Sequence, residues 1–156
     1  MGAGKTTLAR ALAARLDWRA EDVDDRIVAR ERRDIPAIFA RDGEAYFRDV
    51  ERRVLIDLLE SRHVVVATGG GTFADPDNRA LINGDGTSVW LDAPLSTLIA
   101  RVPADGRRPL AADRAQFERL FEQRRLAYAH AHIRLDAGQA GPVESLVERL
   151  LDRLDP

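Results

Sequence analysis

Short apolar runs alternate with longer amphipathic stretches along the chain. The clearest apolar runs occupy 63–68 and 87–92, a shorter one occupies 132–136, and a more polar candidate occupies 18–22. Each has the length and composition of a strand. Apolar residues at three- and four-residue steps predict helices at 5–16, 24–32, 35–41, 44–60, 76–83, 94–102, 113–130 and 142–154. Strands that alternate with helices predict an α/β fold, in which helices flank a parallel sheet.

Length and composition narrow the class of protein. The 156 residues predict a single domain, and the net charge is −2. The arginines are interleaved with nearly as many carboxylates, which argues against a nucleic-acid-binding face. No apolar run approaches the ~20 residues that a membrane-spanning helix needs, and no secretory leader is visible. The absence of cysteine excludes disulfides and thiolate metal sites, and it fits a cytoplasmic protein.

The first residues carry the clearest chemical signal. Lys5 is the only lysine of the chain, and it lies in the sequence GAGKTT, directly before a predicted helix. Small residues let backbone amides turn toward a phosphate, the helix adds its positive end, and the hydroxyl after the lysine can bind magnesium. The sequence therefore predicts a nucleoside triphosphate site formed by Gly2, Ala3, Gly4, Lys5, Thr6 and Thr7, with Thr6 as a metal ligand. The alternative is a glycine-containing turn with a chance lysine.

The complete phosphate-loop pattern has one more glycine, five positions before Gly4, and a strand that precedes it. The sequence begins after both. We therefore expect Met1 to be an internal methionine of a longer protein.

Two acidic residues follow the polar strand candidate. Asp22 and Asp24 are two positions apart, so on a strand their side chains leave the same face and can converge. One could support magnesium through water, and the other could accept a hydroxyl proton. The alternative is that Asp24 and Asp25 cap the following helix.

The helix predicted at 44–60 carries an arginine beside its apolar stripe. Arg48 lies next to the stripe residues Phe47 and Val50, and Glu51 is three positions further on, close enough to orient the guanidinium. The alternative is a surface ion pair worth less than ~1 kcal/mol.

Three further segments carry candidate chemistry. Gly69, Gly70 and Gly71 follow a strong strand, so a ligand can approach their backbone closely; the alternative is a flexible connection. Residues 103–113, which include Arg108, are predicted to be a lid, or otherwise a solvated loop. Arg124, late in the helix at 113–130, could bind a carboxylate bidentately, or otherwise form a solvated charge pair.

Taken in order, the motifs GAGKTT, Asp22-Val23-Asp24, GEAYFRDVE, ATGGGT, RRPL and RRLAY resemble the shikimate kinase family along nearly the whole chain. The resemblance implies the three-layer fold of nucleoside monophosphate kinases, with a parallel sheet in the order 2-3-1-4-5, of which strand 1 is missing or truncated here. It also implies transfer of the ATP γ-phosphate to the 3-hydroxyl of shikimate, a step toward aromatic amino acids.

On the nucleotide side, the resemblance implies that Lys5 contacts the phosphates and Thr6 contacts Mg²⁺, which Asp22 supports indirectly. It further implies that Arg108 reaches the phosphates from the lid and that Arg101 packs on the adenine.

On the substrate side, the resemblance implies that Asp24 orients and deprotonates the hydroxyl. Arg48 and Arg124 would hold the shikimate carboxylate, and Gly69, Gly70 and Gly71 would let the ring lie against the backbone. A substrate-binding segment is expected at about 23–52.

The resulting hypothesis is a monomeric, cytoplasmic shikimate kinase that uses ATP and Mg²⁺ and binds neither nucleic acid nor membrane. Two alternatives stay open. One is another small-molecule kinase with a phosphate loop, such as a gluconate kinase. The other is a catalytically impaired nucleotide-binding module.

Overall fold

The computed structural model describes residues 3–101 and 114–154. The elements in these ranges are α1 (Lys5–Leu16), β1 (Arg19–Asp22), α2 (Val23–Glu31), α3 (Ile35–Leu59), β2 (Val64–Ala67), α4 (Pro76–Asp85), β3 (Val89–Asp92), α5 (Leu95–Arg101), α6 (Arg114–Tyr128), β4 (Ile133–Asp136) and α7 (Val143–Leu154). Every strand and helix expected from the sequence is present, and each end differs from its prediction by at most two residues.

The two helices expected at 35–41 and 44–60 run together as α3. Gly43 interrupts it with a non-helical backbone at φ 82° and ψ 176°, which bends the helix. A positive φ is favourable mainly for glycine, and this explains why the bend falls at that residue. The second arm of α3 therefore starts at the position from which the sequence predicts a new helix.

The four strands form two parallel pairs. Arg19 to Asp22 of β1 lie opposite Val64 to Ala67 of β2, and Val89 to Asp92 of β3 lie opposite Ile133 to Asp136 of β4. Within the described ranges, no strand ladder joins β2 to β3. The order 2-3-1-4-5 places these same pairs on either side of its strand 1, so the arrangement agrees with the expected α/β fold.

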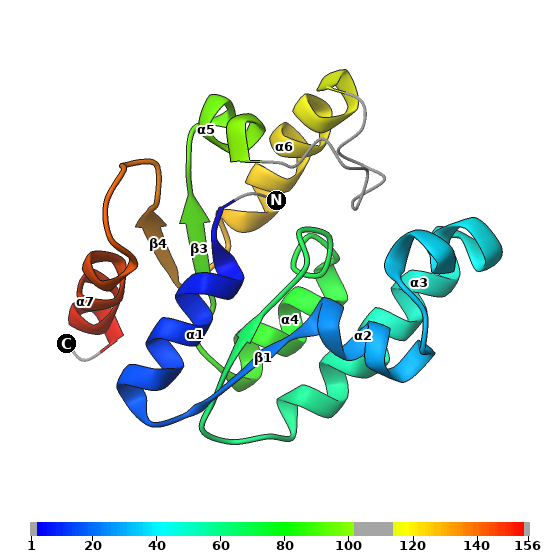
Figure 1. Ribbon diagram of the computed structural model, residues 1–156, viewed down its shortest axis with the longest axis horizontal. Helices are drawn as coiled ribbons and strands as arrows, with labels where there is room; N and C mark the ends of the chain where they lie inside the picture. Colours follow the sequence, from blue (N-terminus) through cyan, green and yellow to red (C-terminus); the bar gives the residue numbers. More distant parts are fainter. Residues whose placement is uncertain (1–2, 102–113, 155–156) are drawn as a thin grey trace.

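The helices bury apolar surface on both sides of α1, which crosses the middle of the molecule (Figure 1). One cluster lies between α2 and α3 and includes Ile27, Ile38 and Phe47. A second joins α1 to β4 and α7 through side chains such as Leu12 and Leu135. α1 contacts β1, β2 and α7, and Thr6 in its first turn reaches Asp22 at the carboxyl end of β1.

The outer strands differ in how their free edges are treated. The first two residues of β1 are exposed, which explains why its sequence is more polar than that of a central strand. On β4, Ile133 and Ala137 donate toward β3, so the carbonyls of Arg134 and Asp136 face the other way. Two arginines of α7 occupy them: Arg153 Nη1 donates to the Arg134 carbonyl at 2.8 Å, and Arg149 Nη2 donates to the Asp136 carbonyl at 2.7 Å.

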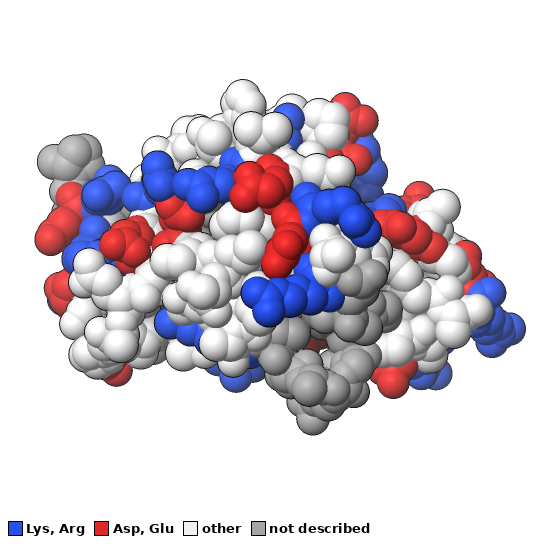
Figure 2. Space-filling view, turned by 90° about the horizontal axis from the view of Figure 1, so that it is seen from above, with Lys and Arg blue, Asp and Glu red and all other residues white. Residues whose placement is uncertain are grey.

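Acidic and basic side chains are interleaved on the face seen in Figure 2. Ion pairs between charged side chains link neighbouring elements, such as Arg30 with Asp57 and Arg52 with Asp77. The described part of the chain contains no helix with the length and apolar composition needed to cross a membrane.

Candidate active site

The N-terminus of α1 differs from the starts of the neighbouring helices. α2, α3 and α4 begin with the aspartates Asp22, Asp34 and Asp75, whose side chains accept hydrogen bonds from their first amides. α1 instead begins after Gly4, which has a φ of 84°, and no side chain within the described ranges caps it. Its first turn also contains no acidic residue. The positive end of α1 is therefore arranged to receive an anion from outside the protein.

A cavity of about 150 Å³ opens in front of this helix end. It is lined by Gly4, Lys5, Thr6, Thr7, Asp22, Asp24 and Thr68. Four residues of the predicted phosphate loop, Gly4 to Thr7, thus share one cavity with both predicted carboxylates and with the residue that follows β2. The ammonium and helix end on one side and the carboxylates on the other suit a phosphate group with an accompanying cation.

Asp22 joins the first turn of α1 to the first turn of α2. Its Oδ2 accepts a hydrogen bond from Thr6 Oγ1 at 2.6 Å, and its Oδ1 accepts the backbone N–H groups of Asp24 at 2.9 Å and Asp25 at 3.3 Å. The cap of α2 is therefore Asp22, and the alternative assignment of that cap to Asp24 and Asp25 is wrong.

The geometry expected for this acidic pair is also wrong. The strand ends at Asp22 and α2 begins at Val23, so the two carboxylates do not leave one face of a strand. Asp24 reaches the cavity from the first turn of the helix instead. Both carboxylates still line one cavity, and Asp22 in addition caps α2.

The donor set of this cavity fits Mg²⁺. The threonine hydroxyls and the two carboxylates that line it are hard oxygen ligands, and Mg²⁺ in nucleotide sites takes one or two carboxylates together with phosphates and waters. The described residues contain no group of three or more acidic, histidine or cysteine side chains that could hold a metal by itself.

The triple glycine lies where three predicted side chains meet. A Cβ atom placed on Gly69 would be 3.3 Å from Asp24 Oδ1, and one placed on Gly70 would be 2.5 Å from Arg124 Nη1. A Cβ on Gly71 would overlap the guanidinium of Arg48, with Cζ at 2.6 Å. The run is therefore more than a flexible connection, because larger residues at Gly70 and Gly71 would displace the two guanidinium groups.

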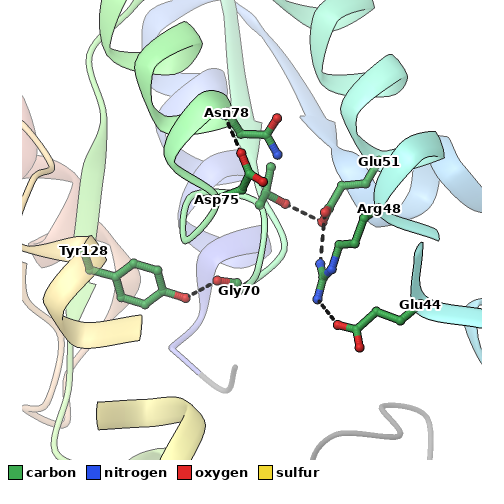
Figure 3. A network of polar contacts seen from close by, with 8 residues as sticks. Glu44, Arg48, Glu51, Gly70, Asp75, Asn78 and Tyr128 are labelled. Carbon is green, nitrogen blue, oxygen red and sulfur yellow. Dashed lines mark hydrogen bonds and ion pairs between the residues drawn. The ribbon is translucent and has the colours of Figure 1, made fainter. Parts of the chain in front are cut away.

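Arg48 is held by a buried carboxylate. Its Nη1 donates to Glu51 Oε2 at 3.0 Å, and its Nη2 lies 3.4 Å from Glu44 Oε1 (Figure 3). Glu51 is only 1% exposed, so the alternative interpretation of a surface ion pair is wrong. Thr72, which is fully buried, donates from Oγ1 to Glu51 Oε1 at 2.6 Å and completes the network.

On the opposite side of the loop, α6 contributes two side chains. Tyr128 Oη donates to the carbonyl of Gly70, and Arg124 lies one helical turn earlier with its guanidinium against the same glycine. Burial raises the pKa of the Tyr128 hydroxyl, and the nearby guanidiniums of Arg124 and Arg48 lower it only in part. The hydroxyl therefore remains a donor at neutral pH.

Comparison with known families decides the relationship of the chain: residues 1–155 match the family described as shikimate kinase. The chain belongs to the shikimate kinase family. Members of this family are ATP-dependent kinases, and the chain is an enzyme of this phosphotransferase class.

Individual shikimate kinases are similar over almost the whole chain. The shikimate kinase of Persephonella marina is 40% identical, and the match covers 99% of this chain and 94% of that protein. The shikimate kinase of Ruegeria pomeroyi is 43% identical, with 99% and 80% covered. Among solved structures, the shikimate kinase from Acinetobacter baumannii in complex with shikimate has a TM-score of 0.94 and 32% identity, with 99% of this chain and 88% of that chain covered. The expected α/β kinase fold is confirmed.

Two of the remaining predicted site residues do not line the cavity, and the others lie outside the described residues. Ala3 packs against the apolar cluster of Ala93, Leu98 and Phe117. Arg101 is exposed at the end of α5 and does not line the cavity. Gly2, Arg108 and the lid predicted at 103–113 lie outside the described residues.

Sequence reasoning missed the parts that Thr72 and Tyr128 play in this site. Two signals were available. Tyr128 is four residues after Arg124, which places both on one face of a helix. Thr72 directly follows the glycines, and the hydroxyl of a threonine in such a short connection needs a hydrogen-bond partner when it is buried.

Proposed function

We propose that the chain transfers the γ-phosphoryl group of ATP to the 3-hydroxyl of shikimate, giving shikimate 3-phosphate and ADP. The observation that carries this proposal is the convergence of Arg48 and Arg124 on the loop formed by Gly69, Gly70 and Gly71, called the glycine loop below. Asp24 lies against its first glycine. A small hydroxylated acid needs two guanidiniums for its carboxylate, a carboxylate for its hydroxyl, and a backbone that it can approach closely.

The phosphates of ATP would bind at the N-terminus of α1, where the uncapped amides and Lys5 supply positive charge. Thr6 would hold Mg²⁺ together with the phosphates, and Asp22, which accepts the hydrogen bond of the Thr6 hydroxyl, would support the cation indirectly. The bound cation would neutralise charge that develops during transfer.

Shikimate would lie on Gly69, Gly70 and Gly71, with its carboxylate between Arg48 and Arg124. Bidentate contacts from two directions would fix the ring, so that its 3-hydroxyl faces the cavity at the start of α1. Asp24 lines that cavity and also lies against Gly69, so it is within reach of both substrates. It would orient the hydroxyl and accept its proton, while the oxygen attacks the γ-phosphorus and ADP leaves.

The proposal is tested by ADP release from the purified chain with ATP and Mg²⁺. We expect shikimate to stimulate release, whereas gluconate and nucleoside monophosphates do not, and we expect chelation of the metal to stop it. Stimulation by gluconate alone would replace the assignment by a gluconate kinase.

Calorimetric titration tests the other alternative, a catalytically impaired nucleotide-binding module. Tight binding of ATP without any binding of shikimate and without ADP release would indicate a nucleotide-binding module that lacks this activity.

We also propose that the enzyme works as a monomer in the cytoplasm, where ATP is available to it. Light scattering of the purified chain tests the first point, and fractionation of the producing cells tests the second. The substrate segment at about 23–52 and the arginines 101 and 108 on the nucleotide side stay predictions of the same scheme.

A further inference from the structure

The glycine loop lies between the two helices that carry the guanidinium groups and contacts both of them. Arg48 comes from α3 and Arg124 comes from α6, and no single helix positions both. Figure 3 shows Gly70 with Tyr128 reaching it from one side and the Arg48–Glu51 pair on the other. The separation of the two guanidiniums therefore depends on how firmly each helix is fixed to this loop.

Three consecutive glycines cannot fix themselves, because glycine has the largest backbone freedom of any residue. The loop has two internal hydrogen bonds, from Thr72 N to the Gly69 carbonyl at 3.1 Å and from Asp75 N to the Gly71 carbonyl at 3.4 Å. The second is long. Hydrogen bonds between this segment and the neighbouring helices have to supply the remaining constraint.

On the α3 side, that constraint is the Thr72 hydroxyl. It is fully buried and donates to one oxygen of Glu51, while the other oxygen of Glu51 receives Arg48. A carboxylate that is 1% exposed cannot replace a lost partner by water at low cost. Removal of the hydroxyl would therefore let the Glu51 carboxylate turn, and Arg48 would turn with it.

On the α6 side, the constraint is the Tyr128 hydroxyl. It donates to the Gly70 carbonyl, and its ring packs between Phe73 at 6.4 Å and Trp90 at 6.2 Å between ring centroids. The ring is held by these contacts without the hydroxyl. The loss of the oxygen alone would thus release the loop without removing the helix from its place.

We propose that Thr72 and Tyr128 are positioning residues, whose hydroxyls fix the glycine loop to α3 and α6 and thereby set the spacing of Arg48 and Arg124. Neither hydroxyl has to touch the substrate. This inference rests on the proposed function, because the spacing matters for a ligand whose carboxylate lies between the two arginines.

The test uses Thr72→Val and Tyr128→Phe, each of which removes one hydroxyl and keeps the shape of the side chain. We expect the KM for shikimate to rise about tenfold, equivalent to ~1.4 kcal/mol, with the KM for ATP and kcat within twofold of wild type. Thr72→Ser, which keeps the hydroxyl, should restore the wild-type KM. A merely structural role would instead lower Tm and change both KM values together.

Ser88→Ala is the matched control. Ser88 is buried in a different hydrogen-bond network, at the N-terminal ends of β3 and β4, whereas the candidate site lies at the carboxyl ends of the strands. Loss of the Ser88 hydroxyl should therefore lower Tm and leave both KM values unchanged. An active wild type whose KM for shikimate does not respond to Thr72→Val or Tyr128→Phe overturns this inference alone. A wild type that neither phosphorylates nor binds shikimate overturns the proposed function and this inference with it.

Discussion

Replacement of Gly71 by alanine tests the convergence of the two arginines most directly. The added methyl group would lie 2.6 Å from both Cζ and Nη2 of Arg48, whereas ordinary contacts begin at 3.4 Å. The guanidinium must therefore retreat by at least about 0.8 Å, the difference between these distances, because its Nη1 lies closer still. Gly71 does not have the positive φ that makes a larger residue strained at Gly4 and Gly43, so the backbone itself can accept alanine.

The expected cost falls on binding and not on folding. The guanidinium is the far end of a flexible side chain and can move, and alanine restricts the unfolded chain by ~0.4–1 kcal/mol in favour of folding. A displaced guanidinium, however, loses the alignment of a charge-assisted contact worth ~1.5–3 kcal/mol. Because ~1.4 kcal/mol corresponds to a factor of ten, the KM for shikimate should rise about 10- to 100-fold.

The assay is steady-state ADP release at saturating ATP, together with Tm from thermal unfolding. Gly84→Ala is the control, because Gly84 lies in α4 with nothing within 4 Å of the added atom. That variant should gain up to ~1 kcal/mol of stability from helix propensity and keep the wild-type KM. A Gly71→Ala enzyme whose KM for shikimate stays within twofold of wild type would show that Arg48 does not bind the substrate from this position.

Three further substitutions separate catalysis, binding and folding. Asp24→Asn should lower kcat by roughly 10²–10⁴ with little change in either KM; an unchanged kcat would limit Asp24 to a structural part. Arg124→Lys should raise the KM for shikimate and leave that for ATP unchanged, because an ammonium cannot form the bidentate contact; equal changes in both would contradict this. Ser88→Ala should lower stability by ~1–3 kcal/mol, since the side-chain Oδ1 of Asn83 and the backbone N–H of His132 each lose a partner; chemical denaturation measures this, and an unchanged midpoint would contradict it.

The fold could be predicted from the sequence because local signals and tertiary contacts agree. Val64 to Ala67 and Val89 to Asp92 are short apolar runs, and each forms a parallel strand, the first paired with β1 and the second with β4. Gly43 marks the bend of α3 because its backbone has a positive φ. The GAGKTT motif was interpretable for the same reason: its chemistry is local, since the helix that it begins supplies the amides.

The details of the candidate site depend on contacts between distant segments, which a sequence pattern does not contain. The pairing of Arg48 with Glu51 follows from helical spacing, but the second hydrogen bond to the Glu51 carboxylate comes from Thr72, which is 21 residues away. Likewise, the i, i+4 spacing places Tyr128 beside Arg124 and says nothing of the Gly70 carbonyl, which is 58 residues away. The cap of α2 was misassigned because the end of β1 and the start of the helix are adjacent, so Asp22 belongs to both.

The arginines of α7 have a consequence for self-association. Open strand edges recruit strands from other molecules, which leads to swapped dimers or fibrous aggregates. On β4, any incoming strand would first have to displace Arg149 and Arg153 from the carbonyls that it needs as acceptors. The C-terminal helix thus shields this side of the molecule against unwanted β-sheet extension.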